Sequence, residues 1–175
     1  MEGLVAALDD GIDRLFSPLR GLKSADTVAY LASELADYSV GWHLLNLTTA
    51  LIDPRLERKA LRMALALGIE SAVVNGGIKP LFNRPRPADW EDAAGKQVRR
   101  PKTASFPSGH ASSGAVAAVL LSDAVPALRP VWWGLAATVA ASRIHTRMHH
   151  ASDVLAGAVV GTAIGLVARS LAPGD

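Results

Sequence analysis

The feature that most constrains the fold is a glycine spacing near the end of the chain. Residues 154–168 form a run of 15 uncharged, mostly apolar positions, in which Gly157, Gly161 and Gly165 recur at every fourth place. Positions four apart lie on the same face of a helix, and small residues there let a second helix approach closely, as in membrane helix pairs. The run predicts a tightly packed helix, whose partner lies either in the same chain or in a second copy of it, so a homo-oligomer is one option.

Composition narrows the class of protein further. The 175 residues are enough for one domain, 1–175, with a buried core. Half of the residues are hydrophobic and only 19% are charged, compared with roughly 25% in average soluble domains. Because the chain has no cysteine, disulfides and thiolate metal sites are excluded. The net charge of +2 is too small to indicate a nucleic-acid partner, so none is expected.

Hydropathy by itself leaves two interpretations open. The longest uncharged apolar runs, 38–52 and 154–168, have 15 residues each, whereas a helix that spans a membrane needs about 20. Flanking residues can extend both helices, and Trp132 with Trp133 suits the interface between lipid and water. We therefore expect a multi-pass protein of the cell membrane, with a soluble helical bundle as the alternative. No secretory signal peptide is expected, since residues 1–19 contain three aspartates and lack a basic start.

Helical periodicity predicts the order of the elements. Apolar residues recur at helical spacing in 3–17, opposite the aspartates, so this segment is predicted to be an amphipathic helix lying on a membrane or forming an ordinary surface helix. Two short helical segments are expected within 25–52. Longer helices are predicted over 56–79, 108–124, 130–145 and 152–170, with a proline-rich loop over 80–107. The predicted fold class is all-α, an antiparallel multi-pass transmembrane helix bundle with an N-terminal amphipathic helix.

Three short polar segments lie at the ends of these predicted helices. In an up-and-down bundle, the end of one helix and the start of the next lie on the same face, so the three segments are expected to converge. Together they supply three cations, a hydroxyl, two histidines and a carboxylate. The segments are Lys79 with Arg86-Pro87, then Pro107-Ser108-Gly109-His110, then Ser142-Arg143 with His149 and Asp153.

The first group of these residues is suited to bind a phosphate. A phosphate monoester carries two negative charges, and Lys79, Arg86 and Arg143 can surround its oxygens with cations and N–H donors. Ser108 is a typical N-cap residue for the helix that follows it, or a phosphate ligand, or both. Gly109 lets the backbone approach an anion closely, where helix amides and the partial positive charge of the helix N-terminus favour it.

The second group is suited to covalent catalysis. Asp153 follows His149 by four residues, about one helical turn, and can accept a proton from one ring nitrogen while the other nitrogen attacks phosphorus. His110 can then protonate the leaving oxygen and later activate water. A metal site is the alternative, because His145, His149 and Asp153 are spaced i, i+4, i+8. Nearby arginines oppose a divalent cation, so neither a metal nor another cofactor is expected.

The three segments carry a family resemblance. The chain resembles the type 2 phosphatidic acid phosphatase superfamily, whose pattern is matched at all eleven positions without a substitution. The resemblance implies the same roles: His149 as the nucleophile of a phosphohistidine intermediate, His110 as acid and base, and Asp153 as the residue that orients His149. It also implies an extracytoplasmic active site. Arg84, two residues before the motif arginine, is expected to be an auxiliary phosphate contact, and Lys96, Arg99, Arg100 and Lys102 can attract anionic substrates.

These features predict a membrane-embedded lipid phosphatase acting on a phosphate monoester or diphosphate, with polyprenyl lipids and glycerophospholipids as candidate substrates. One alternative is a soluble acid phosphatase or a vanadium haloperoxidase of the same superfamily, since vanadate resembles the transition state of phosphoryl transfer. An alternative of another class is a membrane protein that binds lipid phosphates without catalysis. Such a protein would need the cations but neither histidine.

Overall fold

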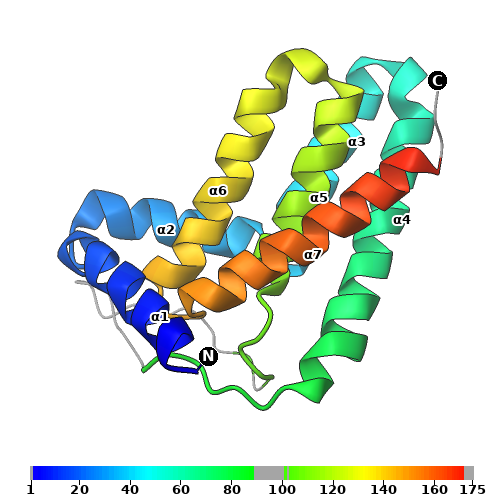
Figure 1. Cartoon of the computed structure of the whole chain (residues 1–175). Helices are drawn as coiled ribbons and strands as arrows, with labels where there is room; N and C mark the ends of the chain where they lie inside the picture. The colour runs from blue at the N-terminus through cyan, green and yellow to red at the C-terminus, as the bar shows by residue number, and fades with distance from the viewer. Residues whose placement is uncertain (1, 89–100, 102, 172–175) are drawn as a thin grey trace.

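The computed structural model describes residues 2–88, 101 and 103–171, and within them all regular structure is helical. The all-α class expected from the sequence is confirmed. Successive helices from α4 to α7 alternate in direction, while α1 and α2 lie across one end of this group (Figure 1). The helices are α1 Glu2–Phe16, α2 Lys23–Leu35, α3 Val40–Ile52, α4 Glu57–Ser71, α5 Gly109–Ala124, α6 Arg129–His145 and α7 Ala151–Ser170.

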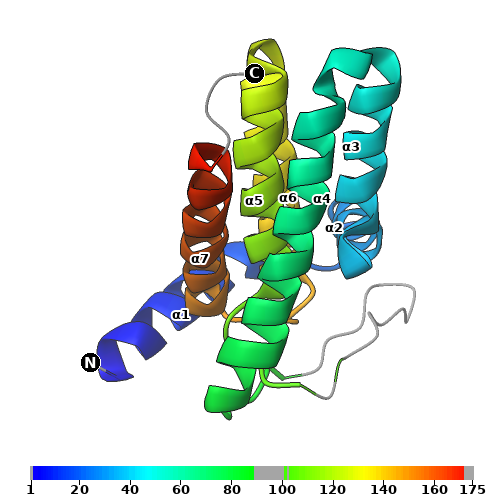
Figure 2. The same cartoon turned by 90° about the vertical axis from the view of Figure 1, so that its right-hand side faces the viewer.

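Helix α5 forms the centre of the bundle, with α4, α6 and α7 arranged around it (Figure 2). Every residue from 111 to 122 is buried. The reason lies in its composition, because alanine, serine and glycine dominate the first half of α5 and leave room for neighbours on all sides. A helix that is apolar all round belongs in a core, and this one is covered by a cluster that includes Trp42, Leu67 and Trp132.

The glycine repeat of α7 packs against α5 of the same chain. A Cβ atom on Gly161 would lie 2.0 Å from the carbonyl oxygen of Ser112, and one on Gly157 would lie 2.3 Å from that of Ser108. Both distances are far below van der Waals contact, so only glycine permits this approach. The choice left open by the sequence is therefore decided in favour of a contact within one chain, and the repeat gives no support to a homo-oligomer.

The helix expected over 56–79 changes its winding before it ends. The α-helical part stops at Ser71 and continues as a π-helix over Ala72–Ile78, followed by a 3-10 turn over Lys79–Leu81. The sequence Asn75-Gly76-Gly77 has low helix propensity, which makes the α-helical winding easy to abandon here. π-Helical segments are often found at functional sites. In this chain the segment leads directly to the first motif lysine.

Helix α1 is amphipathic, as expected, but its faces are reversed relative to an ordinary surface helix. Its apolar side points outward, with Leu4 79% and Leu15 72% exposed, whereas Asp9 is only 6% exposed. The acidic side faces the protein because Asp9 and Asp13 pair with arginines there. The ordinary surface helix, which buries its leucines in a soluble core, is therefore wrong for this segment.

The outer surface of the bundle is also apolar. Large hydrophobic side chains are exposed along α3, α4, α6 and α7, in contrast to the limited apolar patches of soluble monomers. Two helical stretches among the described residues, Pro54–Leu81 and Ala151–Ser170, are long and apolar enough to cross a membrane by length and composition. Of the tryptophan pair, only Trp133 is exposed, since Trp132 is buried and donates to Val125 O. The exposed residues include Leu44, Leu47, Leu51, Leu61, Leu65, Ile69, Val131, Leu135, Leu155, Val159 and Leu166.

The ends of several helices meet at the lower end of the molecule in Figure 1. The last turns of the α4 extension, the start of α5 and the turn between α6 and α7 lie there. This is the convergence expected for the three polar segments. Of the loop expected over 80–107, the structure describes 80–88, 101 and 103–107, so the basic residues Lys96, Arg99, Arg100 and Lys102 lie outside the described part of the chain.

Candidate active site

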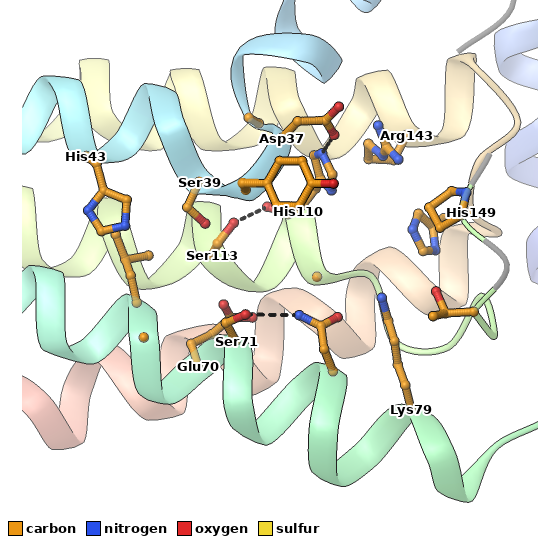
Figure 3. A pocket seen from close by; sticks show the side chains of 18 of the residues that line it. Asp37, Ser39, His43, Glu70, Ser71, Lys79, His110, Ser113, Arg143 and His149 are labelled. Atoms are coloured by element: carbon orange, nitrogen blue, oxygen red, sulfur yellow. Dashed lines mark hydrogen bonds and ion pairs between the residues drawn. The ribbon is translucent and has the colours of Figure 1, made fainter. Parts of the chain in front are cut away.

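A cavity of about 680 Å³ lies at this end of the bundle. Its walls come from the turn before α3, from α4 with its extension, from the start of α5 and from the turn after α6 (Figure 3). Ser108 and Asp153 lie behind the wall rather than on it. The other six residues expected at the site line the cavity: Lys79, Arg86, Gly109, His110, Arg143 and His149.

The three expected cations converge on one region of the cavity. Arg86 donates from Nη1 to Met148 O at 2.7 Å and has the same atom 3.2 Å from His149 Nε2. Arg143 is buried and donates to the hydroxyl of Ser33 in α2. Lys79 Nζ lies over the first turn of α5, where a Cβ on Gly109 would be 3.8 Å from it. An anion placed between them would meet three positive charges in a region of low dielectric, where such charges interact strongly.

The start of α5 supplies backbone donors to the same region. Ser108 Oγ accepts from Ala111 N at 3.4 Å, so this hydroxyl caps the helix, and Ser108 is completely buried. Its own N–H donates to Asp153 O at 3.0 Å, which ties the start of α5 to the start of α7. Gly109 reaches the cavity wall where Ser108 does not. The anion-binding features of this helix N-terminus are therefore Gly109 and the helix dipole.

His149 is positioned by a sharp turn after α6. The helix ends at His145, and Arg147 adopts a φ of 52°, in the left-handed region that is uncommon for residues other than glycine. The N–H groups of Met148 and His149 then both donate to Arg143 O at 3.0 Å. The chain thus folds back beneath the end of α6, which places the His149 ring beside Arg143 in the cavity wall (Figure 3).

The same turn removes the metal alternative based on helical spacing. Because α7 begins only at Ala151, His145 and Asp153 do not share a helix with His149. His145 instead has its Nε2 2.8 Å from Asp26 Oδ1 in α2. In the part of the chain that the structure describes, no group of three histidine or carboxylate side chains is placed to hold a metal ion.

The two nitrogens of His149 have different surroundings. Nε2 faces the cavity beside Arg86, and Nδ1 lies 3.7 Å from Asp153 Oδ2, which is longer than a hydrogen bond. Among the described residues, no hydrogen-bond partner of Nδ1 is found. Catalytic hydrogen bonds are often long without substrate and tighten when it binds. The arrangement leaves Nε2 as the nitrogen that can react and Nδ1 as the one that Asp153 can hold.

The charge state of His149 favours nucleophilic attack. Burial lowers the pKa of its imidazole to about 3, with Arg143 and Arg86 acting in the same direction and Asp153 opposing them. Near neutral pH the ring is therefore uncharged and one nitrogen keeps its lone pair. Burial and the two neighbouring arginines thus both keep the imidazole uncharged.

Asp37 is a candidate site residue that sequence reasoning missed. Its Oδ1 lies 2.9 Å from His110 Nε2, and both residues line the cavity (Figure 3). Asp37 belongs to a short turn between α2 and α3, where Tyr38 and Ser39 have φ values of 52° and 59°. The sequence predicts a break there but gives no signal that pairs positions 73 residues apart. Only the packing of α2 on α6, and of α3 and the turn before it on α5, brings the two side chains together.

Arg84 does not lie where the sequence suggested. It is not among the residues that line the cavity, so the expected auxiliary phosphate contact is wrong. Its guanidinium points away from the cavity and pairs with Asp153 at 2.5 Å and with Asp9 of α1 at 2.6 Å. Arg84 pairs with the two carboxylates because burying them without a cation would be unfavourable. The cavity already has three cations, so a fourth would add repulsion there.

The cavity extends beyond the cations along α4, past polar side chains and then past Ala64, Leu67 and Gly68. Ser71, Asn75 and Glu70 line this part, with Ser113 of α5 opposite them (Figure 3). Glu70 is 2% exposed, and its Oε1 has no hydrogen-bond partner among the described residues. The space is larger than a phosphate requires, and its polar groups can bind part of a substrate adjoining the phosphate.

Comparison with known proteins finds similarity over most of the chain. The family model of the PAP2 superfamily matches residues 59–174. The chain is 33% identical over 142 residues to a decaprenylphosphoryl-5-phosphoribose phosphatase from Mycobacterium tuberculosis H37Rv, covering 81% of this chain and 77% of that protein. It is 34% identical over 141 residues to the protein of the same name from Mycolicibacterium smegmatis, covering 79% and 74%.

Two solved structures have the same fold. One is a transmembrane PAP2 type phosphatidylglycerolphosphate phosphatase from Bacillus subtilis, with a TM-score of 0.74, 21% identity and coverage of 96% of this chain and 86% of that one. The other is Aquifex aeolicus LpxE, with a TM-score of 0.63, 23% identity and coverage of 95% and 92%. The matched residues include all three polar segments around the cavity, and the chain belongs to the PAP2 superfamily and is an enzyme of the phosphatase class.

Proposed function

We propose that this protein is a membrane-embedded lipid phosphatase that works through a phosphohistidine intermediate. The observation that carries the proposal is the position of His149, whose uncharged Nε2 faces a cavity containing Lys79, Arg86 and Arg143. Such a nitrogen can attack phosphorus only if the substrate phosphate is held in place and the negative charge of the phosphate is compensated. The three cations can do both.

In the first half-reaction, the substrate phosphate binds among the three cations and the N-terminal amides of α5. His149 Nε2 attacks phosphorus, the new N–P bond forms, and the bond from phosphorus to the leaving oxygen breaks. His110 donates a proton to that oxygen, so the lipid leaves as an alcohol, or as a phosphate if the substrate is a diphosphate. Asp153 accepts a hydrogen bond from Nδ1–H and stabilises the positive charge that develops on the ring.

In the second half-reaction, water replaces the leaving group. His110, now unprotonated, takes a proton from the water molecule as its oxygen attacks phosphorus. The N–P bond breaks, inorganic phosphate is released, and His149 returns to its uncharged form. The two histidines therefore act on opposite sides of the phosphorus atom, in agreement with their positions on different walls of the cavity.

Embedding in a membrane is supported by the surface of the protein. The large apolar side chains exposed on α3, α4, α6 and α7 would be unfavourable in water and are favourable in lipid. The outward leucines of α1 add a further apolar face at the catalytic end, suited to the interface. The site lies at one end of the bundle. The orientation proposed from the family resemblance has this end outside the cytoplasm.

This orientation is open to a direct labelling test. The chain has no cysteine, so a single cysteine at the exposed Asn83, close to the site, would be unique. In whole cells, a thiol reagent that cannot cross membranes should label this cysteine as fully as a permeant reagent does. Labelling by the permeant reagent alone would place the site on the cytoplasmic side.

The substrate proposed first is a polyprenyl lipid in which a sugar phosphate carries the group to be removed. Two observations support this choice: the curated relatives are named for such a substrate, and the cavity continues past the cations along the polar wall of Ser71 and Asn75. The test is a panel in which phosphatidate, phosphatidylglycerophosphate, a polyprenyl diphosphate and a polyprenylphosphoryl phosphoribose are compared by release of inorganic phosphate. Release from none of them would overturn the proposed function.

Asp37 is expected to assist His110 in this reaction. Asp37→Asn keeps the shape of the side chain but removes the charge that stabilises protonated His110. We expect kcat to fall by roughly 10-fold to 100-fold, less than the roughly 10²-fold to 10⁴-fold contribution of a whole general acid, because His110 itself remains. The measurement is steady-state phosphate release together with a thermal melt. Glu34→Gln removes the charge of an exposed carboxylate on α2 that does not line the cavity, so it is the control and should stay within about twofold of the wild-type kcat. Equal kcat values for Asp37→Asn and the wild type would show that the contact does not serve catalysis.

A further inference from the structure

The side of Asp153 that faces away from the cavity is held by residues outside the three motifs. Arg84 donates from Nη1 to Asp153 Oδ1 at 2.5 Å and from Nη2 to Asp9 Oδ2 at 2.6 Å. One guanidinium is thus shared by two carboxylates, one from α7 and one from α1. Asp153 is fully buried, Asp9 is 6% exposed, and the side chain of Arg84 is 27% exposed. All three therefore interact in a region with little water.

Ser152 completes this cluster and fixes its geometry. Its N–H donates to Asp9 Oδ1 at 2.8 Å, and its hydroxyl donates to Asp9 Oδ2 at 2.9 Å. Arg84 Nη1 also donates to the Ser152 hydroxyl at 2.7 Å. Asp9 therefore binds the first turn of α7 and Arg84 at the same time. Asp9, a residue of α1, therefore helps to hold Asp153, which lies beside the proposed nucleophile His149.

We propose that Asp9 and Arg84 are positioning residues for Asp153, which is an inference that rests on the proposed role of His149. The physical reason is the charge of the cluster. If Arg84 paired with Asp153 alone, its charge would cancel that of the Asp153 carboxylate. Because Arg84 is shared with Asp9, the three side chains together carry one net negative charge beside His149. That charge stabilises the imidazole ring as it becomes positive on forming the N–P bond.

The other charged groups near His149 make this compensation necessary. Arg86 and Arg143 face His149 from the cavity, and Lys79 lies in the same field, so the ring is surrounded by positive charge before it reacts. The Asp9–Arg84–Asp153 cluster supplies negative charge from the opposite side. It also holds Oδ1 of Asp153, while Oδ2 accepts from His150 N at 2.9 Å and faces His149 Nδ1.

A purely structural role would be to anchor α1, and the chain contains a matched control for it. Asp13, one turn further along α1, pairs with Arg20 at 2.5 Å and with Arg147 at 2.8 Å. Its pKa stays below the usual range despite burial, because of these two arginines. Asp13 thus anchors the same helix with two ion pairs, and neither of its two partners is Arg84, the arginine that binds Asp153. Asp13→Asn tests anchoring, whereas Asp9→Asn tests anchoring together with the charge beside Asp153.

The experiment measures kcat and KM for phosphate release from dioctanoyl phosphatidate in detergent micelles, with a thermal melt for every variant. We expect Asp9→Asn to lower kcat by about 10-fold with KM within about twofold. Losses of this size are found when a residue that orients a metal-binding histidine is removed, and the role of Asp9 is analogous. Asp13→Asn should lower the melting temperature to a similar extent and leave kcat within about twofold. An unchanged kcat in Asp9→Asn, or equal losses of kcat in both variants, would overturn the proposal.

A second pair of variants tests the shared charge itself. Arg84→Gln leaves two buried carboxylates without a cation, so one of them takes up a proton, and kcat should fall by roughly 100-fold. Adding Asp9→Asn removes the excess carboxylate, and the double variant should recover at least about 10-fold of that loss. If kcat does not recover in the double variant, the proposal that the charge of Arg84 is shared by Asp9 and Asp153 is contradicted. If Arg84→Gln does not fold, the comparison of Asp9→Asn with Asp13→Asn still decides the question.

The outcomes separate this inference from the proposed function. Wild-type protein that releases no phosphate from dioctanoyl phosphatidate or from any lipid of the panel would remove the function and the inference together. Wild-type activity that is lost in His149→Ala and unchanged in Asp9→Asn would leave the proposed function standing and remove only the role of Asp9 and Arg84.

Discussion

Replacing His149 with alanine is expected to reduce kcat for phosphate release by roughly 10⁴-fold to 10⁶-fold, the range found when a nucleophile is deleted from a catalytic group that acts as a unit. The loss is large because the remaining cations can bind the phosphate but cannot form the covalent intermediate. KM should change little, since Lys79, Arg86 and Arg143 all remain. The measurement is steady-state release of inorganic phosphate from the best substrate of the panel.

The adjacent histidine is the matched control. His150 is the N-cap residue of α7, and its backbone contacts Asp153 twice: its oxygen accepts from Asp153 N at 3.1 Å, and its N–H donates to Asp153 Oδ2 at 2.9 Å. A substitution retains both backbone groups. His150→Asn introduces a favoured N-cap residue and should leave kcat within about threefold of the wild type. Wild-type protein quenched during turnover should also carry an acid-labile phosphate that His149→Ala lacks. Turnover by His149→Ala close to the wild-type rate would favour the alternative in which the protein binds lipid phosphates without catalysing their hydrolysis.

Replacing Gly161 with alanine should have the largest effect on stability. The added Cβ would lie 2.0 Å from the backbone oxygen of Ser112, and a backbone atom cannot move aside as a flexible side chain can. α7 must therefore separate from α5, and we expect the free energy of unfolding to fall by at least about 3 kcal/mol, the upper range for overpacked cores. Because the start of α7 carries Asp153, kcat should fall as well. The measurements are the yield of folded protein in detergent and its melting temperature.

Gly134 of α6 provides the control for this substitution. A Cβ there would meet no atom within 4 Å, so Gly134→Ala adds a methyl group in open space. Alanine is the better helix former, and this variant should be as stable as the wild type or more stable by up to about 1 kcal/mol. Equal melting temperatures for Gly161→Ala and Gly134→Ala would contradict the close contact between α5 and α7.

The two histidines of the site differ in how far the sequence predicts their partners. His149 and Asp153 are four residues apart, so a single turn of chain sets their separation and the sequence suffices to pair them. His110 and Asp37 come from different helices, and their 2.9 Å contact depends on how those helices cross. Crossing angles follow from the packing of many side chains, which no local spacing encodes.

The partners of Arg84 and the exposed face of α1 also could not be predicted from local sequence. From the sequence, an arginine two residues before a motif arginine resembles a second phosphate ligand, and leucines opposite aspartates fit either a helix lying on a membrane or an ordinary surface helix. The structure brings Asp9 and Asp153 to one point, and the two carboxylates draw Arg84 away from the cavity. The same contact turns Asp9 of α1 inward and leaves the leucines of that helix outward.

The sequence by itself determined the family, the all-α class and the residue types that meet around the cavity, because motif spacing and helical periodicity are local properties of the chain. Only the tertiary structure decided that the glycines of α7 pack on α5, and that Ser108 caps a helix behind the cavity wall. It also brought Asp37 to His110, and Asp9 with Arg84 to Asp153. These features depend on contacts between residues far apart in the chain. Such contacts form only when helices pack, since the burial of charge and the exclusion of a methyl group are properties of the assembled core.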